Sequence, residues 1–128
     1  MPRLPRRLVL LAVLAGCAPR LPPEPVEVPG IARAMYGEDP TIDMIAGAHR
    51  FFANPPGMRG NPAAGALGLA QLEYLAAVMA VGGARHDMAI DSAGPLRAGR
   101  AEARAVAGLR ADASPQQAVD SLFAAYEA

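Results

Sequence analysis

The run from Pro62 to Val81 constrains the fold of this chain more than any other segment. Asn61 before Pro62 predicts a helix start, because asparagine caps free amides and proline suits the first helical turn. Gly82 and Gly83 predict its end, since glycine adopts the left-handed conformation that follows many helices. Three side chains interrupt the otherwise apolar surface: Gln71, Glu73 and Tyr74. A helix of this kind is either the core of a domain or a membrane segment. The mid-helix polar residues favour the core.

A shorter helix is expected before this run. Residues 31–36 are predicted to form a helical turn that Gly37 ends, and Thr41 is predicted to be the N-cap of the next helix, with Asp43 in its first turn. The expected inward stripe is Ile42, Ile45, His49 and Phe52. The expected polar face is Asp43, Gly47, Arg50 and Asn54. Residues 54–62 follow as a Pro- and Gly-rich loop.

Two helices are expected in the C-terminal part. Residues 84–94 are predicted to be an exposed connection, and Pro95 opens a helix to about Leu109. Its expected inward positions are Leu96, Ala103, Val106 and Leu109. Residues 114–117 match a capping box with proline at the first helical position. The last helix should bury Val119, Leu122, Phe123 and Tyr126, and expose Gln116, Asp120 and Glu127.

The whole pattern is helical from Ile31 onward. No segment of useful length alternates between apolar and polar residues as a strand would, and no internal repeat is present. The predicted fold is therefore all-α, a small compact bundle of three to four helices over residues 31–128.

The first seventeen residues have the pattern of an export signal. Arg3, Arg6 and Arg7 precede the apolar run Leu8–Ala15, which leads into Leu14-Ala15-Gly16-Cys17. This pattern resembles the lipobox of bacterial lipoproteins. The resemblance implies a signal peptide over 1–16, cleavage between Gly16 and Cys17, lipid on the Cys17 thiol and acylation of the new amino terminus.

Other interpretations of this segment stay open. A transmembrane helix needs about 20 apolar residues, whereas the run Leu8–Ala18 has eleven before Pro19 and spans only about 17 Å. Ala15-Gly16-Cys17 loosely fits the cleavage site of an ordinary secretory signal. The Arg6-Arg7 pair is found in twin-arginine signals, but the polar residues that usually surround the pair are missing.

Residues 17–30 are expected to be the lipidated cysteine and a linker. Five prolines occur between Ala18 and Gly30, so this segment should be extended and unfolded, reaching about 40 Å. Because Ala18 is not an aspartate that would retain the protein at the inner membrane, the lipoprotein resemblance implies the periplasmic side of the outer membrane in a two-membrane bacterium. Membrane lipid, through acylated Cys17, is then the first partner.

Candidate catalytic and metal-binding groups are few. His86, Asp87 and Asp91 are the best local cluster of metal-type ligands, although their spacing fits no standard zinc motif and His49 would have to join them through the fold. A polar helix connection accounts for the same residues without a metal. His49 is expected to be a partly buried, hydrogen-bonded imidazole. Glu38, Asp39 and Asp43 are attributed to helix-start electrostatics rather than to acid–base chemistry.

Arginines and glycines offer two further candidates. Arg97, Arg100 and Arg104 lie on one helix side and form either a solvated face or a basic ridge for lipid headgroups or an acidic partner. Residues 57–60 form either a plain connector or a recognition loop. No glycine-rich phosphate loop and no nucleophile elbow is present.

Composition narrows the function classes. Without residues 1–16 the chain holds nine arginines, no lysine and twelve acidic residues, a net charge near −3, which argues against nucleic-acid binding. Cys17 is the sole cysteine, so no internal disulfide can form. The leading hypothesis is a non-enzymatic envelope protein with an interaction or structural role, an envelope protein as partner and no cofactor. The alternative is a small ligand- or metal-binding or enzymatic domain using His49, His86 and Asp87.

Overall fold

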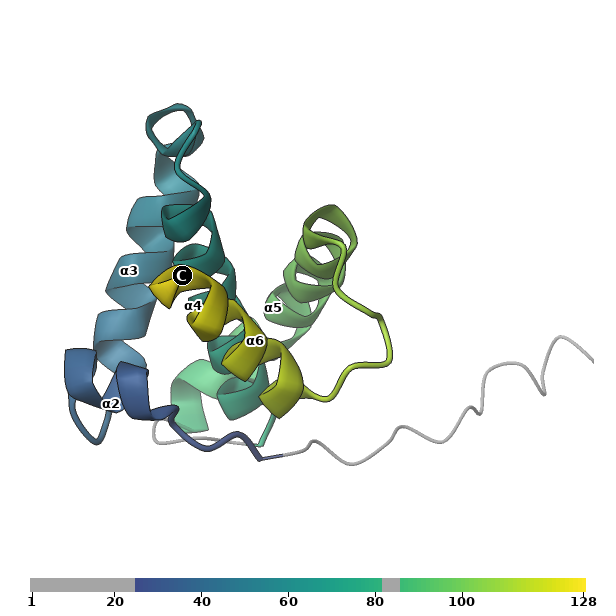
Figure 1. The fold of residues 1–128 in the computed structure, drawn as a ribbon. Helices are drawn as coiled ribbons and strands as arrows, with labels where there is room; N and C mark the ends of the chain where they lie inside the picture. Colours follow the sequence, from purple (N-terminus) through teal and green to yellow (C-terminus); the bar gives the residue numbers. More distant parts are fainter. Residues whose placement is uncertain (1–24, 82–85) are drawn as a thin grey trace, which may run out of the picture.

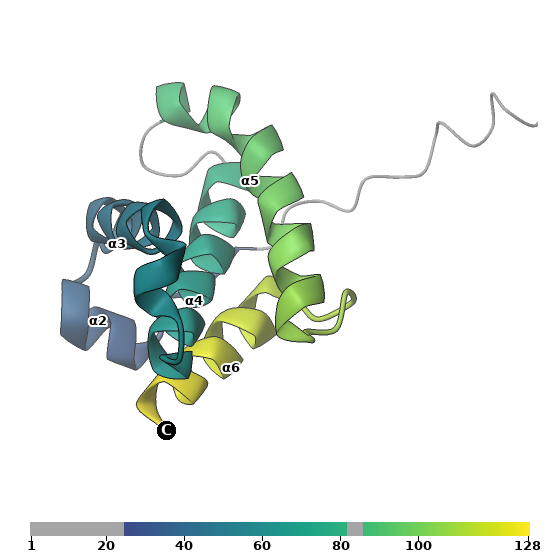
Figure 2. The same ribbon diagram turned by 90° about the horizontal axis from the view of Figure 1, so that it is seen from above.

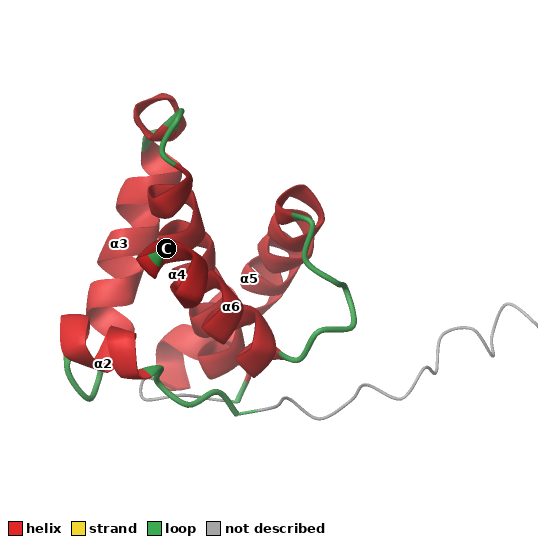
Figure 3. Ribbon diagram, in the orientation of Figure 1, coloured by secondary structure: helices red, strands yellow, loops and turns green. Residues whose placement is uncertain are grey.

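A computed structural model describes residues 25–81 and 86–128 of the chain. Within these ranges the chain forms five α-helices, a short 3-10 helix and no strand, so the all-α prediction is confirmed (Figures 1 and 3). The elements are α2 (Gly30–Tyr36), α3 (Thr41–Ala53), η1 (Pro55–Met58), α4 (Pro62–Ala80), α5 (His86–Ala107) and α6 (Pro115–Glu127). The expected count of three to four is exceeded because residues 30–36 form a helix of their own rather than a turn.

Helix α4 is the centre of the domain. Helices α3, α5 and α6 all pack against it (Figure 2), and its residues 70–77 are buried without a break. The side chain of Asn61 caps its start, accepting a hydrogen bond of 3.0 Å from the Ala64 amide. Among the described residues α4 is the one helix whose length and apolar composition would also suit a membrane span, but 56% of that stretch is buried inside the domain. The three helices around α4 favour the core interpretation.

Helix α6 lies across α4 as its amphipathic pattern predicts. Ser114 accepts from the Gln117 amide at 3.1 Å, and the Gln117 side chain accepts from the Ser114 amide at 3.0 Å, which confirms the capping box. The α6 residues that enter the core are Ala118, Val119, Leu122 and Phe123, with Phe123 only 1% exposed. The spacing of these residues places them on one side of the helix.

The predicted inward stripe of α3 is only partly correct: Ile45 packs against the core as expected, but the other three positions do not. The helix buries Thr41, Met44 and Ala48, whereas Ile42 and Phe52 are about half exposed and His49 is exposed. Gly47 and Ala48 lack bulk, so α3 approaches α4 closely on that side, and a Cβ at Gly47 would overlap the Gln71 side chain. Thr41 is not the N-cap either, because Pro40 occupies that position and Thr41 is the first residue of the helix.

Helix α5 also departs from the prediction. It begins at His86, nine residues before Pro95, so Pro95 lies inside the helix rather than at its start. A proline within a helix removes one backbone hydrogen bond and bends the axis, and α5 curves around α4 in Figure 2. Leu96 and Leu109 pack against the core as expected, but Val106 is 89% exposed.

A buried ion pair joins α4 to α5. The Glu73 carboxylate, 2% exposed, accepts two hydrogen bonds from the Arg104 guanidinium, at 2.6 Å from Nε and 2.9 Å from Nη2. Arg104 also donates to the carbonyl oxygens of Ala111 and Ala113, at 3.3 and 2.8 Å. Arg100 lies 3.5 Å from the same carboxylate. Because the two charges are out of water, these bonds must offset a large loss of hydration.

We expect Arg104→Ala to lower the free energy of unfolding by about 3–5 kcal/mol, since it leaves the Glu73 carboxylate buried without its main partner. A double variant, Glu73→Leu with Arg104→Met, should recover most of that loss because neither charge remains. Urea unfolding followed by circular dichroism measures both. Arg97→Ala is the matched control on the same helix and, being exposed, should change stability by no more than about 0.5 kcal/mol. An equal loss in all three variants would contradict the role of the pair.

The two glycines within α4 provide a second test. A Cβ at Gly68 would overlap the Phe51 ring, whereas nothing lies within 4 Å of a Cβ at Gly65. Gly68→Ala should therefore destabilise the domain by about 1–3 kcal/mol by displacing the ring. Gly65→Ala should stabilise it by roughly 0.5–1 kcal/mol, because alanine suits a helix interior better than glycine. Thermal unfolding of both variants checks the sign of each change.

Candidate functional site

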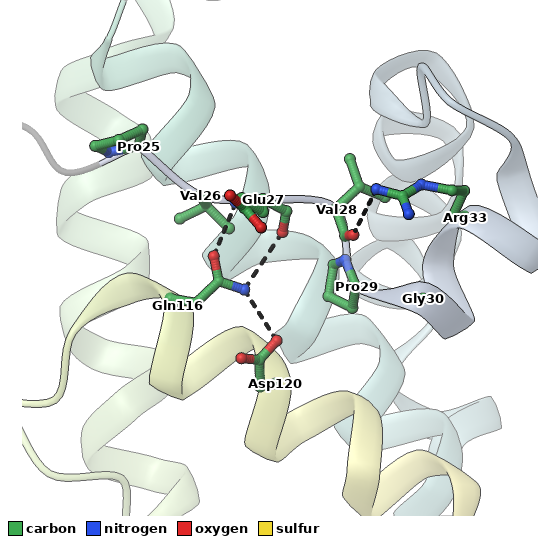
Figure 4. Close-up of a pocket in the computed structure, with 9 residues that line it drawn as sticks. All are labelled: Pro25, Val26, Glu27, Val28, Pro29, Gly30, Arg33, Gln116 and Asp120. Atoms are coloured by element: carbon green, nitrogen blue, oxygen red, sulfur yellow. Dashed lines mark hydrogen bonds between the residues drawn. The ribbon is translucent and has the colours of Figure 1, made fainter.

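The clearest surface feature is an extended segment, residues 25–29, that lies between α2 and the start of α6 (Figure 4). We call this segment the strap. Its backbone is extended, as the prolines predict, but it does not hang free of the domain. Val26 and Val28 are partly buried and pack against the core. The expectation of an unfolded linker is thus wrong from Pro25 onward, because alternate side chains of the strap find an apolar surface.

Gln116 fastens the strap to α6. Its Oε1 accepts from the Glu27 amide at 2.8 Å, and its Nε2 donates to the Glu27 carbonyl oxygen at 3.4 Å and to Asp120 Oδ1 at 2.9 Å (Figure 4). The side-chain amide therefore pairs with one residue of the strap much as a neighbouring β-strand would. The sequence pattern placed Gln116 outward, which concealed this contact because its partner is 89 residues away.

An open groove of about 700 Å³ runs along the strap. Its lining residues are Pro25, Val26, Glu27, Val28, Pro29, Gly30, Arg33, Gln116 and Asp120. The charged and amide groups of the groove are largely engaged in holding the strap. Arg33 donates to the Val28 carbonyl oxygen at 3.4 Å and pairs with Glu38 at 3.2 Å. The strap itself thus forms one wall of the groove, and no nucleophile and base lie side by side among the lining residues.

The candidate metal and acid–base residues are not brought together in the part of the chain that is described. His49 is exposed on α3, so the expected partly buried imidazole is wrong. The side chains of His86, Asp87 and Asp91 lie outside the described residues. Elsewhere in the described part, no group of three or more His, Cys, Asp or Glu side chains could hold a metal ion.

The acidic residues around the start of α3 have local roles. Asp39 accepts from the Thr41 amide at 3.4 Å, and Glu38 pairs with Arg33. Nearby, burial raises the pKa of the Tyr74 phenol. A hydrogen bond with Thr41 opposes this change, and the negative charge of Asp39 adds to it. The raised pKa keeps the phenol neutral at physiological pH, as suits a core residue rather than a reactive phenolate.

The arginine ridge of α5 is turned inward, which differs from both interpretations of its sequence. Arg104 is 5% exposed and Arg100 is partly buried beside Glu73, while Arg97 remains exposed. The signal that could have revealed this is Glu73 itself. A carboxylate in the middle of an apolar helix needs a cation from another element, and α5 supplies two.

Gly16 and Cys17, the predicted cleavage and lipidation site, lie outside the described residues. The nearest described residue is Pro25, at the start of the strap. In comparisons with known proteins, no protein-family model, no curated protein and no solved structure matches this chain.

We expect Gln116→Ala to loosen the strap without unfolding the domain. The Glu27 amide should exchange its hydrogen about fivefold to tenfold faster, as expected for the loss of one hydrogen bond of about 1 kcal/mol. Hydrogen–deuterium exchange resolved at Glu27 measures this. Ser121→Ala, at an exposed position of the same helix, should leave the protection unchanged. Equal exchange in the parent chain and in Gln116→Ala would show that Gln116 does not hold the strap.

Proposed function

We propose that this chain is a lipid-anchored cell-envelope protein whose helical domain acts by binding rather than by catalysis. The observation that carries the proposal is the sequence Leu14-Ala15-Gly16-Cys17 at the end of an apolar run with a basic start. By its resemblance to a lipobox, Cys17 would bear the lipid. In a two-membrane bacterium, the periplasmic side of the outer membrane would be its location.

The strap shortens the free chain between this anchor and the domain. Cys17 and Pro25 are eight residues apart, so a fully extended chain between them spans at most about 29 Å. The whole described domain would then stay close to the membrane surface. This reach is shorter than the 40 Å expected for a free linker, because residues 25–29 are bound to α6 and α2.

A binding role fits how the domain uses its polar groups. The buried charges, Glu73 and Arg104, stabilise the core, and the side chains of Gln116 and Arg33 beside the groove bind the strap. In contrast, Phe52 and Ile42 present apolar side chains to solvent on α3. Aromatic side chains such as Phe52 contribute much of the binding energy at contact surfaces.

Replacing Cys17 tests the anchor. We expect Cys17→Ser in the full chain to abolish labelling by a palmitate analogue and to move the protein from the membrane fraction to the soluble fraction, because the chain has no second thiol. Mass spectrometry of the parent protein should find an acylated N-terminal residue 17. A serine variant that still fractionates with membranes and keeps the same mature terminus would overturn the proposal.

A further inference from the structure

Acidic residues are missing from one end of the domain. Between Asp43 and Glu73 the sequence contains none in twenty-nine positions, while Arg50 and Arg59 both fall in this interval. The structure places these arginines around the turn that joins α3 to α4, which we call the tip (residues 50–61). In Figure 1 the tip projects from the end of the domain opposite the strap. The tip is therefore a local positive site on a chain in which, without residues 1–16, acidic residues outnumber arginines.

The tip arginines are exposed and have no carboxylate partner among the described residues. The ion pairs of the described part of the chain involve Arg33, Arg100, Arg104 and Arg110. Arg50 and Arg59 have none, and both are exposed to solvent. Among the described residues, these two arginines and the exposed Arg97 of α5 are not neutralised by an ion pair. Only the two at the tip lie in a stretch of sequence without acidic residues, so the tip is the site that would attract an anionic surface.

In the sequence, the two arginines enclose residues that form an apolar surface at the tip. Phe52 is 47% exposed, and its ring meets that of Phe51 edge-on with 4.8 Å between centroids. Phe51 in turn lies against Gly68 of α4. The exposed prolines Pro55 and Pro56 follow in η1. An aromatic ring that rests on Phe51 is thus exposed to solvent in the same segment that carries the two arginines.

We propose that the tip is a contact site for an anionic phospholipid bilayer. Phenylalanine on the apolar side of an interfacial segment is buried at the boundary between headgroups and acyl chains, and arginines near an anionic surface bind the phosphates. The tip offers both kinds of group: its exposed ring and prolines suit the apolar part of this interface, and its unpaired arginines suit the phosphates. An acidic protein would account for the arginines but would not require an apolar ring between them.

The geometry lets the tip reach the membrane that holds the proposed anchor. This inference rests on the proposed attachment and deepens it, because it adds a second contact that orients the tethered domain. Helix α3, which ends at the tip, has 13 residues and is about 20 Å long. A fully extended chain from Cys17 to Pro25 spans at most about 29 Å, so the proposed anchor would keep the domain, and the tip with it, near the membrane surface. Two cations and one ring bind weakly alone, but a tether raises their effective concentration at the surface.

The sequence permits a clean measurement, since the chain has one cysteine and no tryptophan. The protein used would comprise residues 17–128, a range that includes every described contact. Its Cys17 thiol would be coupled to a maleimide lipid in vesicles. Phe52→Trp then reports on the tip, and Val106→Trp, at an 89% exposed site of α5, is the matched control. In vesicles rich in phosphatidylglycerol we expect blue-shifted emission and quenching by brominated acyl chains for Phe52→Trp alone. Circular dichroism confirms that both variants are folded.

Charge removal distinguishes binding to an anionic bilayer from apolar adsorption of the ring to any lipid surface. Arg50→Gln with Arg59→Gln should weaken the contact about thirtyfold, roughly fivefold per cation, whereas Arg97→Gln should not. Equal emission in anionic and phosphatidylcholine vesicles, or emission insensitive to the two arginines, would overturn the proposal. The lipid is coupled synthetically, so this test does not depend on acylation by the cell. The tip can therefore fail to bind vesicles while the Cys17→Ser experiment supports the anchor. Equally, the tip can bind vesicles while that experiment refutes the anchor.

Discussion

The packing of this domain depends on one carboxylate. Glu73 lies in the middle of the central helix and is almost fully buried. A buried carboxylate needs a cation as a partner, so the neighbouring helices must pack in a way that brings one to it. Arg104 does so through two hydrogen bonds and continues to the carbonyl oxygens of Ala111 and Ala113. One guanidinium thus ties α4, α5 and the loop before α6 into a single unit. The directionality of these bonds fixes how α5 lies on α4 more narrowly than apolar contact would.

This requirement explains why α5 presents its side chains as it does. Its apolar residues are sparse, so hydrophobic burial alone gives the helix little preference among rotations. Turning Arg100 and Arg104 toward Glu73 leaves Val106 in solvent. Losing the burial of one valine costs roughly 1.5–3 kcal/mol, less than leaving a buried carboxylate without its partner. Pairing the Glu73 carboxylate therefore contributes more to the orientation of α5 than burying Val106 would.

The remaining surface features divide between the two ends of the domain. At one end Gln116 holds the strap, which seven residues separate from Cys17 in the sequence. At the other end the tip carries cations that the domain does not neutralise. A protein attached at the first end and drawn to lipid at the second would lie on a membrane in one orientation, with the rest of its surface turned to other envelope components.

Local features of this protein were determined by its sequence. The all-α class, the start of α4 at Asn61, the capping box at Ser114 and the buried stripe of α6 all depend on contacts within one or two helical turns, which neighbouring residues specify. Tertiary structure alone decided which face α3 buries, where Arg104 points and how the strap docks. Glu73 and Arg104 are 31 residues apart, and Glu27 and Gln116 are 89. The periodicity of the sequence identifies the apolar side of a helix. A close approach between helices, as at Gly47, or a buried charge on a neighbouring helix can select another side for burial. Packing and ion pairing act between elements that are far apart in the sequence, so local periodicity does not reveal them.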